Sequence, residues 1–214
     1  MALGSPTNHK GEIMKKTVSA LEHYDRLIDE NNDPVHDPER LQSYMNRWDG
    51  MPFMDLMQLD LGKTALEIGI GTGRLAIQIA SRCKALYGID ISQKTVTRAK
   101  ENLATHQNVF LIHGDFLDFP FDRTFDVLYS SLTWMHIQKK AEAMKKAASL
   151  LEKGGRFVLS IDKNQKDFLE LGTRKVKIYP DSVNHIRDCV QAAGLVTEQV
   201  TKTAFAYLVA AVKI

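Results

Sequence analysis

Apolar and polar positions follow two different rhythms along this chain, and the rhythm changes near residue 62. Before that point apolar residues recur every three or four positions, which predicts amphipathic helices. The repeating positions are Val18, Leu21, Tyr24 and Ile28 in a first helix, and Leu41, Tyr44, Met45 and Trp48 in a second. A short third helix is expected over residues 53–59. The N-terminal portion is therefore predicted to be helical.

After residue 62, short apolar runs alternate with helical patterns. The pattern predicts strands at 64–69, 85–90, 108–115, 124–131 and 156–162, and helices at 72–83, 92–105, 137–154 and 180–194. Two closing strands are expected at 195–201 and 204–214. This alternation favours an α/β fold, in which parallel strands are joined by right-handed crossovers and helices cover both faces. The last two strands are too close for a crossover, so they should form an antiparallel hairpin.

Composition narrows the class of protein. The 214 residues carry 28 basic and 26 acidic side chains, a formal net charge of +2, which is not the footprint of a nucleic-acid binder. No stretch is long and apolar enough for a membrane helix. Two isolated cysteines, Cys83 and Cys189, predict neither a disulfide framework nor a metal site, and they suggest a reducing, cytoplasmic environment. Residues 1–13 are expected to be a disordered leader.

The motif "LEIGIGTG" places three glycines at every second position, directly after the first predicted strand. They are Gly69, Gly71 and Gly73. Glycine allows a positive φ and lacks the Cβ that would keep a ligand away from the backbone. In open α/β sheets, ligands bind beyond the carboxyl ends of the strands, where this turn should lie. We therefore expect a nucleotide-like ligand against the turn.

Acidic residues stand at the predicted ends of neighbouring strands. Glu67 precedes the glycines, Asp90 ends the second strand and Asp115 ends the third. Asp90 is placed to accept hydrogen bonds from ribose hydroxyls. Asp115 is placed to accept one from an adenine amine, with Phe116 against the ring. Each acid also has an ordinary structural interpretation, as a loop or helix-capping residue, but three together favour a nucleoside site.

The spacing of the glycines bears on which nucleotide binds. A dinucleotide fingerprint G-x-G-x-x-G that begins at Gly69 requires a small residue at position 74, where Arg74 stands. The fingerprint survives in a shifted register that begins at Gly71 and ends at Ala76. An NAD-linked oxidoreductase therefore remains an alternative at this point.

As a set, these motifs resemble those of the class I S-adenosylmethionine-dependent methyltransferases. The matching segments are "LEIGIGTG", "YGIDIS", "HGDF", "FDVLYSSLTWMH" and "LLEKGGRFVLS", within residues 60–214. The resemblance implies a Rossmann-like, doubly wound, mostly parallel seven-stranded sheet with an antiparallel last strand over residues 62–214. It also implies that residues 14–61 form a helical cap over the site.

The same resemblance implies S-adenosylmethionine as cofactor and assigns residues to it. Gly69 and Gly71 would contact the methionine part, Asp90 the ribose, and Asp115 with Phe116 the adenine. The predicted set is completed by Glu67, Gly73, Ile91 and Ser130. The loop after the fourth strand lacks the N/D-P-P-[YF] motif of adenine or glutamine methylation, the cysteine of cytosine-C5 methylation and the acid of a catechol-type magnesium site, so no metal is expected.

Direct displacement of a methyl group requires alignment and exclusion of water more than it requires a particular side chain. His136 and Tyr24 are candidates for a general base, although His136 could point to solvent and Tyr24 could be a core aromatic. Tyr24 and Trp134 are candidates for the substrate pocket. The basic run at 173–181 could attract an anionic substrate, but a solvated strand edge is the commoner meaning.

Three hypotheses follow. The first is a methyltransferase that acts on a small-molecule acceptor, with neither nucleic acid nor membrane as partner. The second is an NAD-linked oxidoreductase. The third is a non-catalytic nucleotide-binding module. The acid at position 115 and the terminal hairpin favour the first hypothesis over the second.

Overall fold

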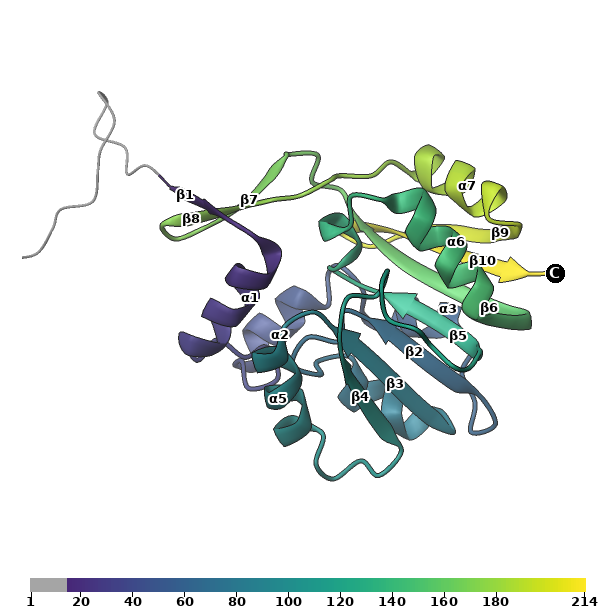
Figure 1. The fold of residues 1–214 in the computed structure, drawn as a ribbon, viewed down its shortest axis with the longest axis horizontal. Coiled ribbons are helices and arrows are strands. Elements are labelled where there is room, and N and C mark those ends of the chain that lie inside the picture. The colour runs from purple at the N-terminus through teal and green to yellow at the C-terminus, as the bar shows by residue number, and fades with distance from the viewer. Residues whose placement is uncertain (1–14) are drawn as a thin grey trace, which may run out of the picture.

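The computed structural model describes residues 15–214, so the predicted leader lies outside the described residues. Its centre is a seven-stranded sheet in the order β4-β3-β2-β5-β6-β10-β9 (Figure 1). The strands are β2 (Thr64–Ile68), β3 (Ala85–Asp90), β4 (Val109–His113), β5 (Phe125–Ser130), β6 (Leu151–Asp162), β9 (Leu195–Lys202) and β10 (Ala206–Lys213). Strands β2 to β6 run parallel, and β10 is antiparallel to both β6 and β9. The predicted mixed sheet with an antiparallel last strand is confirmed.

Helices pack on both faces of this sheet, as the alternating pattern predicted. Those around it are α3 (Gly50–Met57), α4 (Ala76–Ile79), α5 (Gln93–Asn102), α6 (Lys140–Leu150) and α7 (Val183–Ala192). One buried cluster joins the sheet to α6 and α7 through residues such as Met144 and Ile186. A second cluster joins the other face to α3, α4 and α5, with Phe53, Ile79 and Ala99 buried in it. The core therefore has the layers of a doubly wound fold.

A second, smaller sheet was not predicted. It has the order β1-β8-β7 and consists of β1 (Lys16–Val18), β7 (Phe168–Leu171) and β8 (Arg174–Lys177). Val18, assigned by its spacing to the first helix, instead pairs with Val176 of β8. The pairing brings the N-terminal segment against a hairpin inserted between β6 and α7, and it leads directly into α1 (Ala20–Asp29) (Figure 1).

Two predicted helices differ from those observed. The helix expected at 72–83 is reduced to α4 and a 3₁₀ turn, Ala80–Arg82. The helix expected to end at Gly154 and Gly155 ends at Leu150, because Leu151 already pairs with Phe125 in the sheet. Tertiary strand pairing therefore overrides the apolar helical spacing at this boundary.

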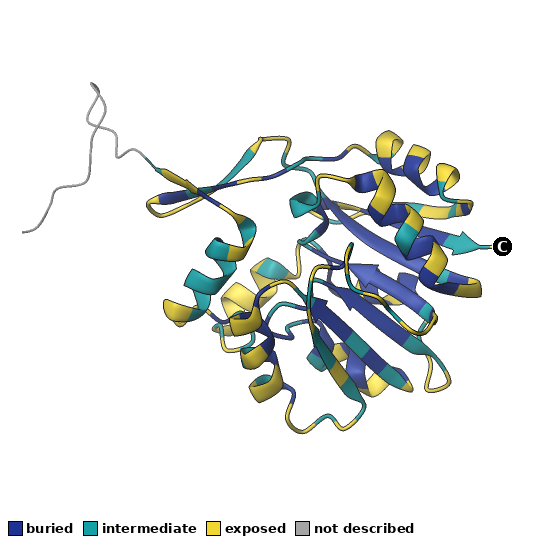
Figure 2. Cartoon of the chain, viewed as in Figure 1, coloured by how far each residue is buried: buried dark blue, intermediate teal, exposed yellow. Residues whose placement is uncertain are grey.

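Burial is unevenly distributed between these parts. Strands β2, β5, β6 and β10 of the seven-stranded sheet are largely buried, whereas the edge strands β4 and β9, together with α1 and α2 (Glu39–Met45), are mostly intermediate or exposed (Figure 2). Helix α2 contains no buried residue. Among the described residues, none of the helices has both the length and the apolar character that a bilayer crossing requires.

Candidate functional site

The three glycines of the turn after β2, residues 69–73 and here called the glycine turn, all have positive φ, but for different reasons. A Cβ at Gly69 would lie 2.1 Å from the side chain of Thr133, and one at Gly73 would lie 2.9 Å from Leu103. A Cβ at Gly71 would meet no atom within 4 Å. Gly69 and Gly73 therefore serve packing, whereas Gly71 presents bare backbone to open space.

Asp90, at the end of β3, is fixed beside this bare backbone. One carboxylate oxygen accepts a hydrogen bond from the backbone N–H of Gly71 at 3.0 Å, and the other accepts one from Ser92 at 3.0 Å. Burial raises the pKa of Asp90, and these backbone hydrogen bonds oppose the rise. Ser92 caps α5 by accepting a hydrogen bond from the N–H of Thr95. The carboxylate is therefore oriented before any ligand binds.

A cavity of about 920 Å³ opens over the glycine turn at the carboxyl edge of the sheet. It lies where the strand order reverses between β2 and β5, the usual ligand position in such sheets. Its volume is at the upper end of the range for small-molecule sites, about 300–1,000 Å³. The predicted site residues that line it are Tyr24, Glu67, Gly69, Gly71, Asp90, Ile91, Asp115, Phe116 and His136.

Three other predicted residues do not line this cavity. Gly73 faces Leu103, as described above. The Ser130 side chain is buried and donates a hydrogen bond to the carbonyl oxygen of Ile68 at 2.9 Å. Trp134 is 2% exposed and packs on Phe157, with ring centroids 5.4 Å apart. The structure thus places all three in the support of the site, with Trp134 belonging to the core.

Glu67 lies under the glycine turn and is 3% exposed. Its carboxyl group receives a hydrogen bond from the hydroxyl of Tyr129 at 2.9 Å. Burial raises the pKa of Glu67 to about 8, so the carboxyl is mostly protonated at neutral pH. A cation placed near it would favour ionisation and lower this pKa.

A buried ion pair beneath the cavity was not foreseen. Asp49, the residue before α3, is fully buried and accepts hydrogen bonds from Ser131 at 2.7 Å and Gly50 at 2.7 Å. Arg74, at the end of the glycine turn, pairs with the same carboxylate at 2.5 Å. This arrangement joins the N-terminal segment, the glycine turn and the loop after β5. One indication of this ion pair was present in the sequence: Arg74 stands where the dinucleotide fingerprint requires a small residue.

Tyr24 and His136, the two candidates for a base, are hydrogen-bonded to each other. The Tyr24 hydroxyl lies 3.0 Å from Nε2 of His136, although the residues come from α1 and from the loop after β5. Burial lowers the pKa of His136 to about 4, with His23 and Lys140 adding to the effect. Burial and the nearby Asp90 raise the pKa of Tyr24. Both side chains are therefore neutral at neutral pH.

The loop that carries His136 is held in an unusual conformation. Leu132 lines the cavity with φ of 58°, a region that residues other than glycine rarely adopt. Buried Lys140 donates a hydrogen bond to the carbonyl oxygen of Trp134 at 2.6 Å and pairs with Asp181 at 2.7 Å. These contacts fix the loop between β5 and α6 at the edge of the cavity.

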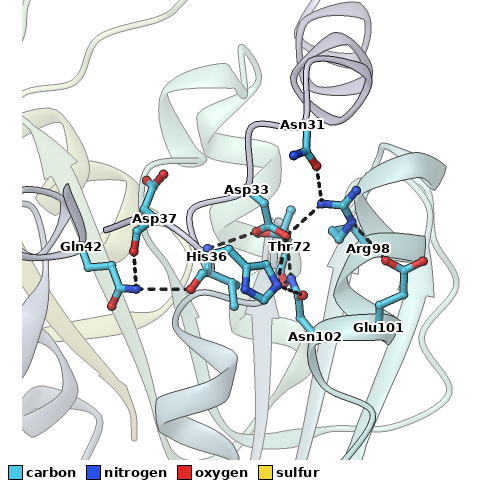
Figure 3. A network of polar contacts seen from close by, with 10 residues as sticks. Asn31, Asp33, His36, Asp37, Gln42, Thr72, Arg98, Glu101 and Asn102 are labelled. Carbon is cyan, nitrogen blue, oxygen red and sulfur yellow. Dashed lines mark hydrogen bonds and ion pairs between the residues drawn. The ribbon is translucent and has the colours of Figure 1, made fainter. Parts of the chain in front are cut away.

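A polar network anchors the segment between α1 and α2 beside the glycine turn (Figure 3). Asp33 is 5% exposed and accepts hydrogen bonds from Asn102 at 3.0 Å and Arg98 at 3.3 Å. The Asn102 amide also donates to the carbonyl oxygen of Thr72 at 2.9 Å. Burial opposes ionisation of Asp33, but its hydrogen bonds outweigh burial and leave its pKa below the usual value.

A second anchor joins α1 to the small sheet. Arg174 of β8 is mostly buried and makes a bidentate ion pair with Glu30, in which its two terminal guanidinium nitrogens lie 2.5 and 2.7 Å from the two carboxylate oxygens. Its Nε–H donates to Nδ1 of His23 at 3.0 Å. Burial and the neighbouring Arg174 lower the pKa of His23. Helix α1 and the hairpin β7–β8 are thereby connected along one side of the cavity.

Comparison with known proteins agrees with this geometry. A family described as "Methyltransferase domain" matches residues 66–159. An "Uncharacterized methyltransferase" of Anoxybacillus flavithermus is 30% identical over 169 residues, which cover 71% of this chain and 78% of that protein. The chain therefore belongs to the class I S-adenosylmethionine-dependent methyltransferases, the family that its motifs predicted. S-adenosylmethionine as the methyl donor agrees with this membership.

Other similar proteins match more narrowly or only in fold. Relatives from Geobacillus species are 34–35% identical, and the chain spans about half of their length, 46–47%. The magnesium protoporphyrin IX methyltransferase of Synechocystis PCC 6803 has a TM-score of 0.67 at 18% identity, covering 90% of this chain and 96% of that one. The [4+2]-cyclase SpnF has a TM-score of 0.71 at 15% identity, covering 94% and 98%. These two likenesses show the fold.

Proposed function

We propose that this protein transfers a methyl group from S-adenosylmethionine to a small-molecule acceptor by direct displacement. The observation that carries this proposal is the bare backbone at Gly71, which faces open space inside the cavity beside the fixed carboxylate of Asp90. An adenosyl group requires both features, a flat main-chain surface and an acceptor for ribose hydroxyls. A structurally similar methyltransferase is known with S-adenosylmethionine bound.

The residues around the cavity fit this cofactor. Asp90 would hold the ribose and Asp115 the adenine amine, with Phe116 against the ring. All three line the cavity at the ends of β3 and β4. The glycine turn would hold the methionine part, with Glu67 beneath it. Because Glu67 is buried and mostly protonated, a nearby cationic group would be stabilised by its ionisation.

The bound cofactor supplies an electrophilic methyl group on a sulfonium. The contribution of the chain is to hold an acceptor in line and to exclude water, which can lower a barrier by about 7–11 kcal/mol in favourable cases. The cavity suits this task because segments distant in sequence enclose it: α1, α2, β7 and the loop after β5. Its volume supports an acceptor of small-molecule size.

The Tyr24–His136 pair is the group that we assign to proton transfer. With a pKa of about 4, His136 is neutral at neutral pH, so one of its ring nitrogens can accept a proton. An acceptor hydroxyl or amine becomes strongly acidic as its new bond forms, so a weak base is sufficient to take the proton. His136 Nδ1 is buried and has no hydrogen-bond partner among residues 15–214. Within that range, the hydrogen bond with Tyr24 is therefore the one that the imidazole ring makes.

A screen for release of S-adenosylhomocysteine tests this function. Phenols, amines, thiols and carboxylic acids would be offered with S-adenosylmethionine, and turnover with at least one small molecule is expected. The variants Tyr24→Phe and His136→Gln should lower kcat by about 10²–10⁴ without weakening cofactor binding. His106→Gln, in the loop after α5 and away from the cavity, is the matched control. Turnover with macromolecular acceptors alone, or an unchanged kcat in both variants, would contradict the proposal.

A cytoplasmic location is part of the same proposal. Cys83 and Cys189 are both free and buried, which is the state expected in a reducing compartment.

A further inference from the structure

The apolar stripe of α2 does not serve the purpose that its spacing predicts. Leu41, Tyr44 and Met45 recur at helical spacing with Trp48 just beyond the helix, the pattern of a helix packed on a core. Yet α2 has no buried residue, and Leu41 and Tyr44 are each 48% exposed. All four residues line the cavity, and Tyr44 and Trp48 also pack on Phe205. The stripe therefore faces a space that a ligand can fill.

Another apolar surface lines the same cavity from the small sheet. Leu169 and Leu171 of β7 belong to it, and Leu171 is 39% exposed. The apolar wall is defined here as Leu41, Tyr44, Met45, Trp48, Leu169 and Leu171. Exposed apolar side chains gathered around one cavity are typical of a binding site for an apolar molecule.

The charges around the cavity disfavour an anionic acceptor. Among residues 15–214, the cations that line it are Arg74, paired with Asp49, and Lys139, paired with Glu142 at 3.1 Å. The carboxylates that line it are those of Asp37, Asp90, Asp115 and Asp162, whereas Glu67 is mostly protonated at neutral pH. An anion placed here would meet like charges and no unpaired side-chain cation, which is costly away from water.

The basic run at 173–181 does not change this balance. Arg174 is paired with Glu30, and Lys177 lies 3.3 Å from the carboxylate of Asp167. Neither of these cations lines the cavity, and neither does Lys175. The run therefore forms a strand edge beside the site, and its charge is not available to an acceptor inside.

We propose that the methyl acceptor is an uncharged molecule with an extended apolar body, such as an alkyl-substituted phenol. Its body lies along the apolar wall, and its single proton-bearing group faces the Tyr24–His136 pair. This inference rests on the proposed methyltransferase function and specifies its substrate class. It requires no side-chain cation and places the apolar body against a wall in which Leu41, Tyr44 and Leu171 are otherwise exposed.

Binding of matched phenols to the full chain saturated with S-adenosylhomocysteine tests the inference without any turnover. The probes are 4-propylphenol, 4-hexylphenol and 6-(4-hydroxyphenyl)hexanoate. Binding is measured by calorimetry and by fluorescence of the two tryptophans, of which Trp48 lines the cavity. Each buried methylene should tighten binding by about fourfold. We therefore expect 4-hexylphenol to bind at least about tenfold tighter than 4-propylphenol, and the carboxylated probe to bind at least about tenfold more weakly than 4-hexylphenol.

Two leucine variants connect the result to the apolar wall. Leu41→Glu should weaken 4-hexylphenol binding by about tenfold, whereas Leu21→Glu should leave it unchanged. Leu21 is 39% exposed on α1 and does not line the cavity, so it matches Leu41 in residue type and exposure. Both variants should bind S-adenosylhomocysteine with the affinity of the wild type.

The outcomes separate the two proposals. If the chain binds S-adenosylhomocysteine but its affinity for phenols is independent of chain length, or the carboxylated probe binds as tightly, the substrate class is wrong and the methyltransferase function stands. Equal losses in Leu41→Glu and Leu21→Glu would likewise overturn the apolar wall as the site. A chain that binds no S-adenosylhomocysteine would overturn both proposals.

Discussion

Two regions of the cavity differ in how they are held. The glycine turn with Asp90 is fixed by main-chain hydrogen bonds and rests on the buried sheet. The apolar wall belongs to α2, the residues just after it and the small sheet. These parts lie outside the seven-stranded sheet and are anchored in part by side-chain contacts, such as those of Asp33 and Arg174. The glycine turn and Asp90 are therefore held as part of the buried core, whereas the apolar wall is a partly exposed surface that borders the cavity.

The difference shows why one region has a clear sequence motif. The glycine turn requires one residue type at neighbouring positions, and the acids must stand at the ends of strands, so both can be recognised in the sequence. An apolar wall needs apolar side chains but no fixed order. The comparison predicts that substitutions in and beneath the glycine turn lower the free energy of unfolding strongly, whereas substitutions in the apolar wall lower it little.

The largest effect is expected from the protonation of Glu67. Burial raises its pKa from 4.5 to about 8, so the folded state binds the proton more tightly than the unfolded chain. The stability that the protonated form provides is fully present below pH 4.5 and is lost as pH rises to about 8. At 1.36 kcal/mol per pKa unit, the total loss is about 5 kcal/mol.

The variant Glu67→Gln isolates this contribution because its side chain cannot ionise. We expect wild-type stability to fall relative to that of Glu67→Gln between pH 5 and pH 8, measured by chemical denaturation at both values. Parallel pH profiles for the two proteins would show that the carboxyl of Glu67 is not buried as described.

The buried ion pair of Arg74 and Asp49 gives the next effect. Arg74→Ala leaves the Asp49 carboxylate buried without its cation, and we expect a loss of about 3–5 kcal/mol in the free energy of unfolding. Arg26→Ala is the control in α1, where Arg26 lies at the same distance, 2.5 Å, from Glu22 on an exposed helix face. It should lose only about 0.3–0.5 kcal/mol. Similar denaturation midpoints for the two variants would contradict the contrast between buried and exposed regions.

Gly71 separates ligand binding from folding. Gly71→Ala places a Cβ in open space at a φ of 59°, which should cost about 1–2 kcal/mol of stability and weaken S-adenosylhomocysteine binding at least about tenfold. Gly194→Ala, at a φ of 78° with no neighbour within 4 Å, should show a comparable folding cost and no loss of affinity. Calorimetric titration of both variants measures the difference, and equal affinities would mean that the ligand does not contact Gly71.

The smallest effect is expected on α2. Leu41→Ala should change the free energy of unfolding by less than about 0.5 kcal/mol, because the side chain is half exposed. Leu56→Ala, on the buried face of α3, should cost about 2–5 kcal/mol. Thermal or chemical denaturation of the two alanine variants compares them directly. A large loss for Leu41→Ala would show that α2 packs as a core helix after all.

The sequence predicted the large sheet closely because its signals are local. The second strand was expected at 85–90 and is observed as Ala85–Asp90, and the following helix, expected to begin at residue 92, begins at Gln93. The small sheet was missed because β1 pairs with β8 more than 150 residues away and its strands carry mixed polar residues. Pairing over such a distance leaves no periodic signal in either segment.

The sequence also did not show which side chains point into the cavity. Trp134 and His136 are two residues apart, yet one packs in the core and the other lines the cavity. The contact of Tyr24 with His136 and the pair of Arg74 with Asp49 each join distant segments, so no spacing rule relates them. The acids at strand ends were easier to place because parallel strands end at one edge.

The central claim, that the glycine turn and Asp90 form a site for an adenosyl group, is tested most directly by calorimetric titration. S-adenosylhomocysteine and NAD would be titrated in parallel into the wild type and Asp90→Ala. We expect S-adenosylhomocysteine to bind the wild type, to bind Asp90→Ala at least about 100-fold more weakly since charged hydrogen bonds contribute about 1.5–3 kcal/mol each, and NAD to give no measurable binding. Tight NAD binding without binding of S-adenosylhomocysteine, or equal affinity in Asp90→Ala, would contradict the claim.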